Sequence, residues 1–140
     1  MTFIPESEYK EIIKKMPIFC GDFLITAERK YLLIKRDVQP FKDVYWVIGG
    51  RLRHNETMMQ FAERIQIQEI GRSFPEFKLI IGFSNYFFPN TPDARATHTP
   101  TLLHIVEAKE IFEPKIDNRH TDYIWSEKLP KELLDQTIFV

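Results

Sequence analysis

The sequence is poor in cysteine, with a single thiol at Cys20 among 140 residues. One thiol excludes an internal disulfide and any zinc site built from several cysteines. No apolar run approaches the roughly 18 residues that a membrane-spanning helix needs, and no basic-then-apolar segment opens the chain as in a secretory signal. We therefore expect a protein of the reducing cytoplasm, with no membrane partner.

Net charge is also nearly absent. The 19 Lys and Arg residues are balanced by 20 Asp and Glu residues, which leaves a net charge of −1. The chain as a whole thus lacks the basic footprint of a nucleic-acid-binding protein. Disorder is excluded as well, because aromatic residues reach 14% of the sequence and disordered chains have few of them. We expect residues 1–140 to form a single domain, since domains commonly hold about 100–150 residues.

Hydrophobic periodicity predicts an alternation of helices and strands. Apolar residues recur at helical spacing from Tyr9 to Met16 and again over 56–70, where Gly71 would end the helix. A last short helix is expected at 130–136. Strands are predicted at 18–26, 31–36, 44–48, 77–88, 101–111 and 123–125. This order predicts an α/β fold in which helices flank a mixed sheet.

The segment with the clearest chemical content is 49–71, which reads GGRLRHNETMMQFAERIQIQEIG. A glycine pair lets the backbone turn sharply and brings its carbonyl groups close to a ligand. Glu56, Glu63 and Glu69 follow along the predicted helix. Carboxylate and carbonyl oxygens suit a divalent cation such as Mg²⁺, which would neutralise charge on a leaving diphosphate. The simpler interpretation is a solvated helix face, and it is the better one for Glu63.

The spacing of Gly50, Glu56, Arg64, Glu69 and Gly71 resembles the Nudix box. Two glutamates of that pattern are replaced here, by Ile65 and Gln68. Further similar segments are Asp22-Phe23, the run 32–36, Tyr45-Trp46 and the His-x-Asp-Tyr-x-Trp sequence at 120–125. Together with the two replacements, these segments make the chain similar to the GDP-mannose mannosyl hydrolase branch of the Nudix hydrolase family.

The resemblance implies a Nudix-type α/β/α sandwich with a mixed β-sheet. It also implies hydrolysis of the glycosyl bond of a nucleotide-sugar, GDP-mannose or GDP-glucose, to release nucleoside diphosphate and sugar. His120 would be the general base, and Mg²⁺ or Mn²⁺ would bind the Gly49 carbonyl and Glu69, with Glu56 as a further candidate ligand. The remaining site residues it implies are Arg36, Arg51 and Arg64 on the diphosphate, and Asp22, Arg36, Arg119 and Tyr86 on the substrate. A homodimer is expected by the same resemblance.

Four positions depart from the pattern of that branch, one of them Thr101, which stands where a tyrosine is usual. Arg119 stands where the branch has a metal-binding glutamine, and a guanidinium has no lone pair for a cation. Ile48 replaces a proline, and Tyr86 stands where a second histidine is usual. Two alternatives therefore stay open: a Nudix pyrophosphohydrolase that acts on another nucleoside diphosphate derivative, and a non-catalytic nucleotide-binding protein. The aromatic residues of 83–88 could stack on a nucleobase, although alternating strand aromatics are more often part of a core.

Overall fold

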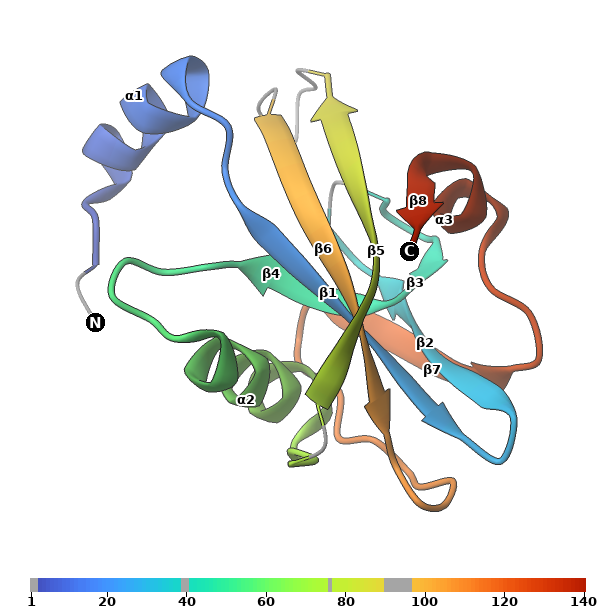
Figure 1. Cartoon of the computed structure of the whole chain (residues 1–140). Coiled ribbons are helices and arrows are strands. Elements are labelled where there is room, and N and C mark those ends of the chain that lie inside the picture. Colours follow the sequence, from blue (N-terminus) through green and yellow to red (C-terminus); the bar gives the residue numbers. More distant parts are fainter. Residues whose placement is uncertain (1–2, 39–40, 76, 90–96) are drawn as a thin grey trace.

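The computed structural model describes residues 3–38, 41–75, 77–89 and 97–140, except for the side chains of 77–79. Three helices and eight strands are formed in this part of the chain. Their bounds are α1 Glu6–Lys15, β1 Cys20–Ala27, β2 Lys30–Arg36, β3 Tyr45–Trp46, β4 Ile48–Arg51, α2 Met58–Ile70, β5 Phe77–Phe88, β6 Thr97–Glu107, β7 His120–Ser126, α3 Lys131–Gln136 and β8 Thr137–Phe139. The predicted mixed sheet with flanking helices is confirmed (Figure 1).

Strand β1 lies at the centre of the sheet, whose strand order is β3-β2-β1-β6-β5-β8. It runs parallel to β6 and antiparallel to β2, and β4 pairs with its first half. Strand β7 pairs with β2, so that Arg36 on β2 is the register partner of His120 on β7. These pairings bring residues from positions 22, 36, 49 and 120 to one region of the sheet.

Helix α2 has well-defined ends. The Thr57 side chain accepts a hydrogen bond from the Gln60 N–H, and the Gln60 side chain accepts one from the Thr57 N–H, which is a capping box. At the other end Gly71 adopts the left-handed conformation with φ of 76° and donates to the Ile67 carbonyl. Glu56 therefore precedes the helix, and the predicted helix start at position 56 was wrong by two residues.

The predicted strand 44–48 is in fact two short strands with different partners. Tyr45 and Trp46 pair with β2, whereas β4 begins at Ile48 and pairs with β1. Gly49 and Gly50 consequently lie inside a strand rather than in a turn. A Cβ at position 49 would lie 2.1 Å from the Asp22 Oδ1 and 2.6 Å from the Gly21 carbonyl oxygen. Glycine is needed there because the two strands approach so closely.

Other strands begin or end at residues that differ from the predicted bounds. Strand β6 begins at Thr97, four residues before the predicted strand 101–111, and it ends at Glu107 rather than at position 111. Residues 90–96, which precede it, lie outside the described residues. Strand β7 begins at His120, three residues before the predicted strand 123–125. Strand β8 was not predicted, since three residues are too few for a periodic signal and its pairing with β5 is long-range.

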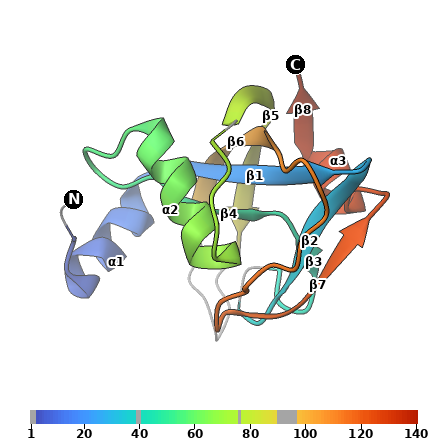
Figure 2. The ribbon, with the colours of Figure 1, turned by 90° about the horizontal axis from the view of Figure 1, so that it is seen from below.

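Two apolar clusters fill the two faces of the sheet. Helix α2 covers one face, where Phe61 and Ile65 pack with Phe23. The other face carries Trp46 and Leu133, the latter from α3, and Figure 2 shows the two helices on opposite sides. Among the described residues no helix combines the length and the apolar content that crossing a membrane requires.

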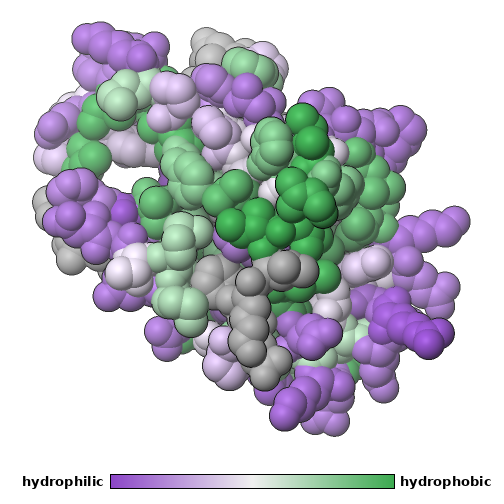
Figure 3. Space-filling view, viewed as in Figure 1, coloured by the Kyte–Doolittle hydropathy of each residue, from purple (hydrophilic) through white to green (hydrophobic). Residues whose placement is uncertain are grey.

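The sheet is less completely covered along β5. Phe83 and Phe87 are 45% and 69% exposed, and Ile138 on the neighbouring β8 is exposed beside Phe83. Apolar side chains gather over this region in the space-filling view (Figure 3). The core interpretation of the β5 aromatics is thus wrong for Phe83 and Phe87, and it holds for Tyr86, which is buried.

Candidate functional site

A cavity of about 680 Å³ opens between helices α1 and α2 and the sheet. Polar side chains from several elements line one part of the cavity, which we call the polar end. Aromatic side chains line another part, which we call the aromatic end. The lining includes Tyr9 and Ile12 of α1 and the following Met16; Asp22 and Arg36 of β1 and β2; Gly49, Gly50 and Arg51 of β4; Arg64, Gln68 and Glu69 of α2; Phe41, Trp46, Tyr86 and Phe88; and Arg119. Most of the residues that the sequence singled out therefore surround one space.

Two carboxyl groups flank Gly49 at the polar end. The buried Glu69 accepts a hydrogen bond from the Gly49 N–H through Oε2, at 3.1 Å. Asp22 is the register partner of Gly49, and its carboxyl lies against the glycine backbone. Burial raises the pKa of Glu69 to about 8, although the Gly49 N–H and the nearby guanidinium groups oppose the shift. Burial likewise raises the pKa of Asp22 to about 7, against the opposing effect of Arg36.

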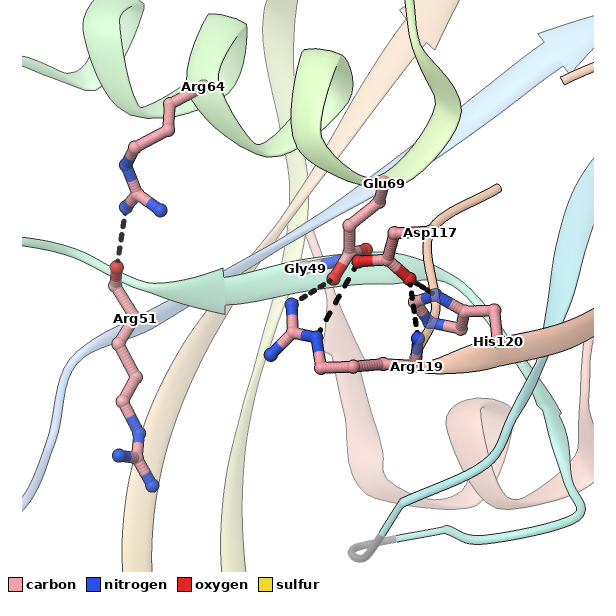
Figure 4. Close-up of polar contacts among 7 residues, drawn as sticks. All are labelled: Gly49, Arg51, Arg64, Glu69, Asp117, Arg119 and His120. Carbon is pink, nitrogen blue, oxygen red and sulfur yellow. Dashed lines mark hydrogen bonds and ion pairs between the residues drawn. The ribbon is translucent and has the colours of Figure 1, made fainter. Parts of the chain in front are cut away.

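Arg119 connects Glu69 to a second acid, Asp117. Its Nη2 lies 3.4 Å from the Glu69 Oε1, and its Nε lies 3.5 Å from the Asp117 Oδ2. Its backbone N–H also donates to the Asp117 Oδ1. The side chain of Arg119 is still 46% exposed. Figure 4 shows this arginine stretched between the two acids, with its charged end beside Glu69.

His120 lies behind Arg119 rather than in the cavity. Its Nδ1 is hydrogen-bonded to the Asp117 carboxylate, and its side chain is only 3% exposed. Burial lowers the pKa of this imidazole, and Asp117 partly offsets the shift. The described lining of the cavity does not include His120. The predicted base is thus close to the polar end, but in this arrangement it does not reach the space where a substrate would bind.

Arg36 adds a second guanidinium to the polar end. It is partly buried and lines the cavity. Burial lowers its pKa, and the negative charge of Glu69 raises it. Arg119 lowers the pKa of Arg36 further, as expected for two like charges near each other. The polar end therefore combines two guanidinium groups with the carboxyls of Asp22, Glu69 and Asp117.

Glu56 and Arg64 belong to a different cluster. The Arg64 Nε donates to the Glu56 Oε2 at 2.6 Å, and its Nη2 donates to Oε1 at 2.9 Å. The Arg53 N–H also donates to Oε1, and Arg64 reaches the carbonyl of Arg51. Arg64 and Arg51 stand apart from the Glu69 group in Figure 4. The structure therefore does not bring Glu56 to Gly49 and Glu69, with which the sequence grouped it as a metal ligand.

Arg51 is also directed away from the polar end. Its guanidinium donates to the hydroxyl of Tyr9 on α1 and lies 5.0 Å from the centre of that ring. Arg51 thus holds α1 against β4 at the rim of the cavity. Of the three arginines expected on the diphosphate, Arg36 alone lies among the acids of the polar end.

The aromatic end is built from four rings. Phe41 stacks on Trp46 with ring centres 4.2 Å apart, and Phe88 stacks on Tyr86 at 5.6 Å. Phe41 also meets Phe88 edge to face. Trp46 and Tyr86 are buried, whereas Phe41 and Phe88 are only partly covered. Sequence reasoning had named Tyr86 as a substrate contact but missed Phe41, which carries no periodic signal in its loop.

The donor set does not suit a divalent cation. Mg²⁺ takes six oxygen ligands, of which the protein usually supplies one or two carboxylates while phosphates and water supply the rest, so at least one carboxylate must be free to bind it. Here Ile65 and Gln68 replace two acids of helix α2, Glu56 is held by Arg64, and Glu69 faces Arg119. No group of three or more His, Cys, Asp or Glu among the described residues could hold a metal ion. The predicted Mg²⁺ or Mn²⁺ therefore does not fit this arrangement of side chains.

Comparisons with known proteins separate the fold from the activity. No family model matches the sequence. The MutT protein of Methanosarcina mazei Go1 superposes with a TM-score of 0.67 and 19% identity, over 86% of this chain and 91% of that one. The NUDIX domain of Shewanella oneidensis NrtR, solved with ADP ribose, gives 0.64 and 16%, over 95% and 88%. The chain has the Nudix fold. At these identities the likeness establishes the fold alone.

One curated relative also matches in sequence. The low-salt glycan biosynthesis protein Agl8 of Haloferax volcanii is 31% identical over 70 residues. That match spans half of this chain and 45% of the length of Agl8. It covers too little of Agl8 to transfer that protein's activity. Within the Nudix fold, the function has to be argued from the cavity.

Proposed function

We propose that the chain hydrolyses a nucleoside diphosphate sugar in this cavity, with GDP-mannose and GDP-glucose as the first substrates to test. The reaction is cleavage of the glycosyl bond by water, which releases nucleoside diphosphate and free sugar. The observation that carries the proposal is that one cavity is lined by guanidinium groups, Arg36 and Arg119 among them, and by a cluster of four aromatic rings.

The polar end suits a diphosphate. Guanidinium groups present a planar fork of donors that matches phosphate oxygens. Arg36 and Arg119 both line the cavity, and Arg119 is exposed enough to offer donors to a ligand. The Nudix-fold domain of NrtR was solved with ADP ribose, in which a diphosphate joins a nucleoside to a sugar through the 5′ oxygen of that sugar. This likeness supports the same ligand class here.

The aromatic end suits the ring portions of such a ligand. Half-covered rings such as Phe41 and Phe88 can stack on a nucleobase or contact a sugar face. The cavity volume of about 680 Å³ lies within the range of roughly 300–1,000 Å³ that is usual for small-molecule sites. The partial similarity to Agl8, a glycan biosynthesis protein, is consistent with a sugar-bearing substrate.

Glycosyl cleavage is favoured over pyrophosphate cleavage because few acids face the cavity. Attack at phosphorus depends on cations that neutralise charge on the transferred group, and the side chains here do not suit such ions. Helix α2 presents Glu69 to the cavity, whereas Glu63 is exposed elsewhere on the helix. Attack at the anomeric carbon needs a base for the water and support for the departing diphosphate.

Two groups are candidates for that base. A general base must come within hydrogen-bond reach of the attacking water. His120 was predicted from the sequence, but its ring is buried against Asp117. Asp22 lines the cavity, and its pKa of about 7 suits proton transfer near neutral pH. We therefore propose Asp22 as the base in the arrangement described, and His120 only if its ring turns toward the cavity.

Product identity tests the proposal. Purified protein is incubated with GDP-mannose, with Mg²⁺ and separately with EDTA, and the nucleotides are separated by ion-exchange chromatography. GDP with free mannose is the expected result. GMP with mannose phosphate would instead establish a pyrophosphohydrolase and overturn glycosyl cleavage.

A second function is favoured by one contact. Arg119 lies against Glu69, the one acid of the segment 49–71 among the described residues that line the cavity. This contact suits a protein that binds a nucleotide without turning it over. GDP-mannose that binds in a calorimeter but yields no product over a panel of nucleotide-sugars would establish that alternative.

Two further expectations remain predictions. The resemblance to the Nudix branch implies a homodimer in which the N-terminal helix lies near the partner. Helix α1 contains no buried residue in the single chain, and it lies at the edge of the molecule (Figure 1). Sedimentation equilibrium tests the dimer. The predicted cytoplasmic location is tested by cell fractionation.

A further inference from the structure

We propose that the polar end binds the diphosphate through Arg36 and Arg119 without a divalent cation. This inference rests on the proposed function, because it assigns the groups that hold the same diphosphate. It departs from the sequence-based expectation of Mg²⁺ or Mn²⁺. The disagreement arises from the side chains themselves.

The carboxylate oxygens of Glu69 and Asp117 already have partners. Glu69 accepts from the Gly49 N–H through one oxygen and faces Arg119 through the other. Asp117 is engaged by His120 and by both the backbone and the side chain of Arg119. A cation bound by Glu69 or Asp117 would have to displace the Arg119 guanidinium from that acid. It would also lie beside the positive charges of Arg36 and Arg119.

The Arg119 guanidinium is held beside Glu69, which is where the expected cation would bind. Asp117 fixes it from two sides, through its backbone N–H and its Nε, so the guanidinium is positioned before any ligand arrives. Its side chain remains 46% exposed. A guanidinium has five donors, and the Glu69 and Asp117 contacts use only some of them. The others are available to phosphate oxygens that enter the cavity.

Arg64 shows what an arginine without this capacity looks like. Its Nε and Nη2 are bound to Glu56 and to the Arg51 carbonyl, at distances of 2.6–2.9 Å. Its side chain is 17% exposed. The contacts of Arg119 are longer, at 3.4 and 3.5 Å, and its side chain is more open. Arg119 can therefore exchange a weak internal contact for a phosphate.

The test is calorimetric binding of GDP in EDTA and in Mg²⁺. We expect the dissociation constant to differ by less than about threefold between the two buffers, since the binding charge belongs to the protein. Arg119→Gln should weaken binding in EDTA by about tenfold or more, which is the scale of a lost charge-assisted hydrogen bond. Arg29→Gln removes the same charge at the exposed β1–β2 turn, away from the cavity lining, and should leave binding unchanged.

Three other results would overturn the inference, and the last of them would overturn the proposed function as well. GDP that binds tightly in Mg²⁺ and not in EDTA overturns the inference and leaves the proposed function standing. Parent-like binding of Arg119→Gln in EDTA also overturns it, because the guanidinium would then contribute nothing. GDP that fails to bind in both buffers overturns the proposed function together with the inference. Circular dichroism of each variant confirms that the comparison is made between folded proteins.

Discussion

Arg64 and Arg119 both pair with a glutamate of the segment 56–70, yet the two pairs differ in kind. Arg64 grips Glu56 with two short hydrogen bonds, and the glutamate side chain is fully covered. Arg119 reaches Glu69 through one longer contact and stays open to the cavity. Figure 4 shows the two groups apart from each other. Arg64 and Glu56 satisfy each other's hydrogen bonds, which indicates a structural ion pair. Arg119 makes longer contacts at the cavity, so its remaining N–H donors can bind a ligand.

The largest expected effect is a loss of activity when an acid of the polar end is substituted. Asp22→Asn should lower the turnover of GDP-mannose by about 10²–10⁴-fold, the usual contribution of positioned proton transfer. His120→Gln, which alters a side chain outside the cavity lining, should lower it far less. The rates are measured by GDP release at pH 7. The reverse order of the two effects would return the role of base to His120.

A substitution in the Glu56–Arg64 pair should instead lower the free energy of unfolding. Arg64→Met leaves the covered Glu56 carboxylate without its main partner, and breaking a buried ion pair costs about 3–5 kcal/mol. Urea unfolding measures the loss. The matched control is Glu63→Gln, an exposed residue on the same helix, which should change stability by less than about 0.5 kcal/mol. Equal stabilities of Arg64→Met and the parent protein would remove the distinction between the two groups.

The pH dependence of stability sharpens the comparison further. The pKa of Glu69 is raised to about 8 in the folded chain, from an ordinary value of 4.5. Between these values the unfolded chain releases a proton that the folded chain retains, so stability falls as pH rises through this window. Glu69→Gln keeps an acceptor for the Gly49 N–H and removes the titration. It should gain roughly 1–3 kcal/mol relative to the parent between pH 5 and pH 8.

The pH profile is followed by urea unfolding at both pH values. A parallel decline in the parent and in Glu69→Gln would show that Glu69 is ionised in the fold. The pKa of Glu56 is lowered, mainly by its hydrogen bonds to Arg64, so its contribution has the opposite sign and is lost only in acid. The two glutamates thus predict opposite pH responses from one helix segment.

The smallest expected effect is at the rim. Tyr9→Phe removes the hydroxyl that accepts from Arg51 but keeps the ring that the guanidinium overlies. Because this contact is exposed, we expect a loss of about 0.5 kcal/mol or less in urea unfolding. A loss of several kcal/mol would mean that α1 is anchored chiefly through this contact.

Local signals accounted for most of the fold. Apolar periodicity located α1 and α2, the short helix α3 was also expected, and the glycine at 71 marked the end of α2. The exchange of partner at Val47 could not be predicted, because β3 and β4 are defined by pairing with β2 and β1 rather than by their own pattern. Strand β8 could not be predicted either, because it is defined by its pairing with β5.

The site was predictable as a set of residues but not as an arrangement. The Nudix resemblance pointed to Asp22, Arg36, Gly49, Glu69 and Arg119, which do line one cavity. It could not show that Arg64 would hold Glu56, since that pairing depends on how the loop 52–57 returns to the helix. Asp117 was missed altogether. Its place three residues before His120 is the only local signal for it, and its contacts with Arg119 and His120 appear only in the fold.

The most direct test of the central claim is a crystal structure of the chain with GDP, grown in EDTA. We predict that diphosphate oxygens lie within hydrogen-bond distance of the guanidinium groups of Arg36 and Arg119, with the Glu56–Arg64 pair unchanged. A diphosphate that contacts neither arginine, or that lies outside the cavity, would contradict the proposal that this end of the cavity is the nucleotide site.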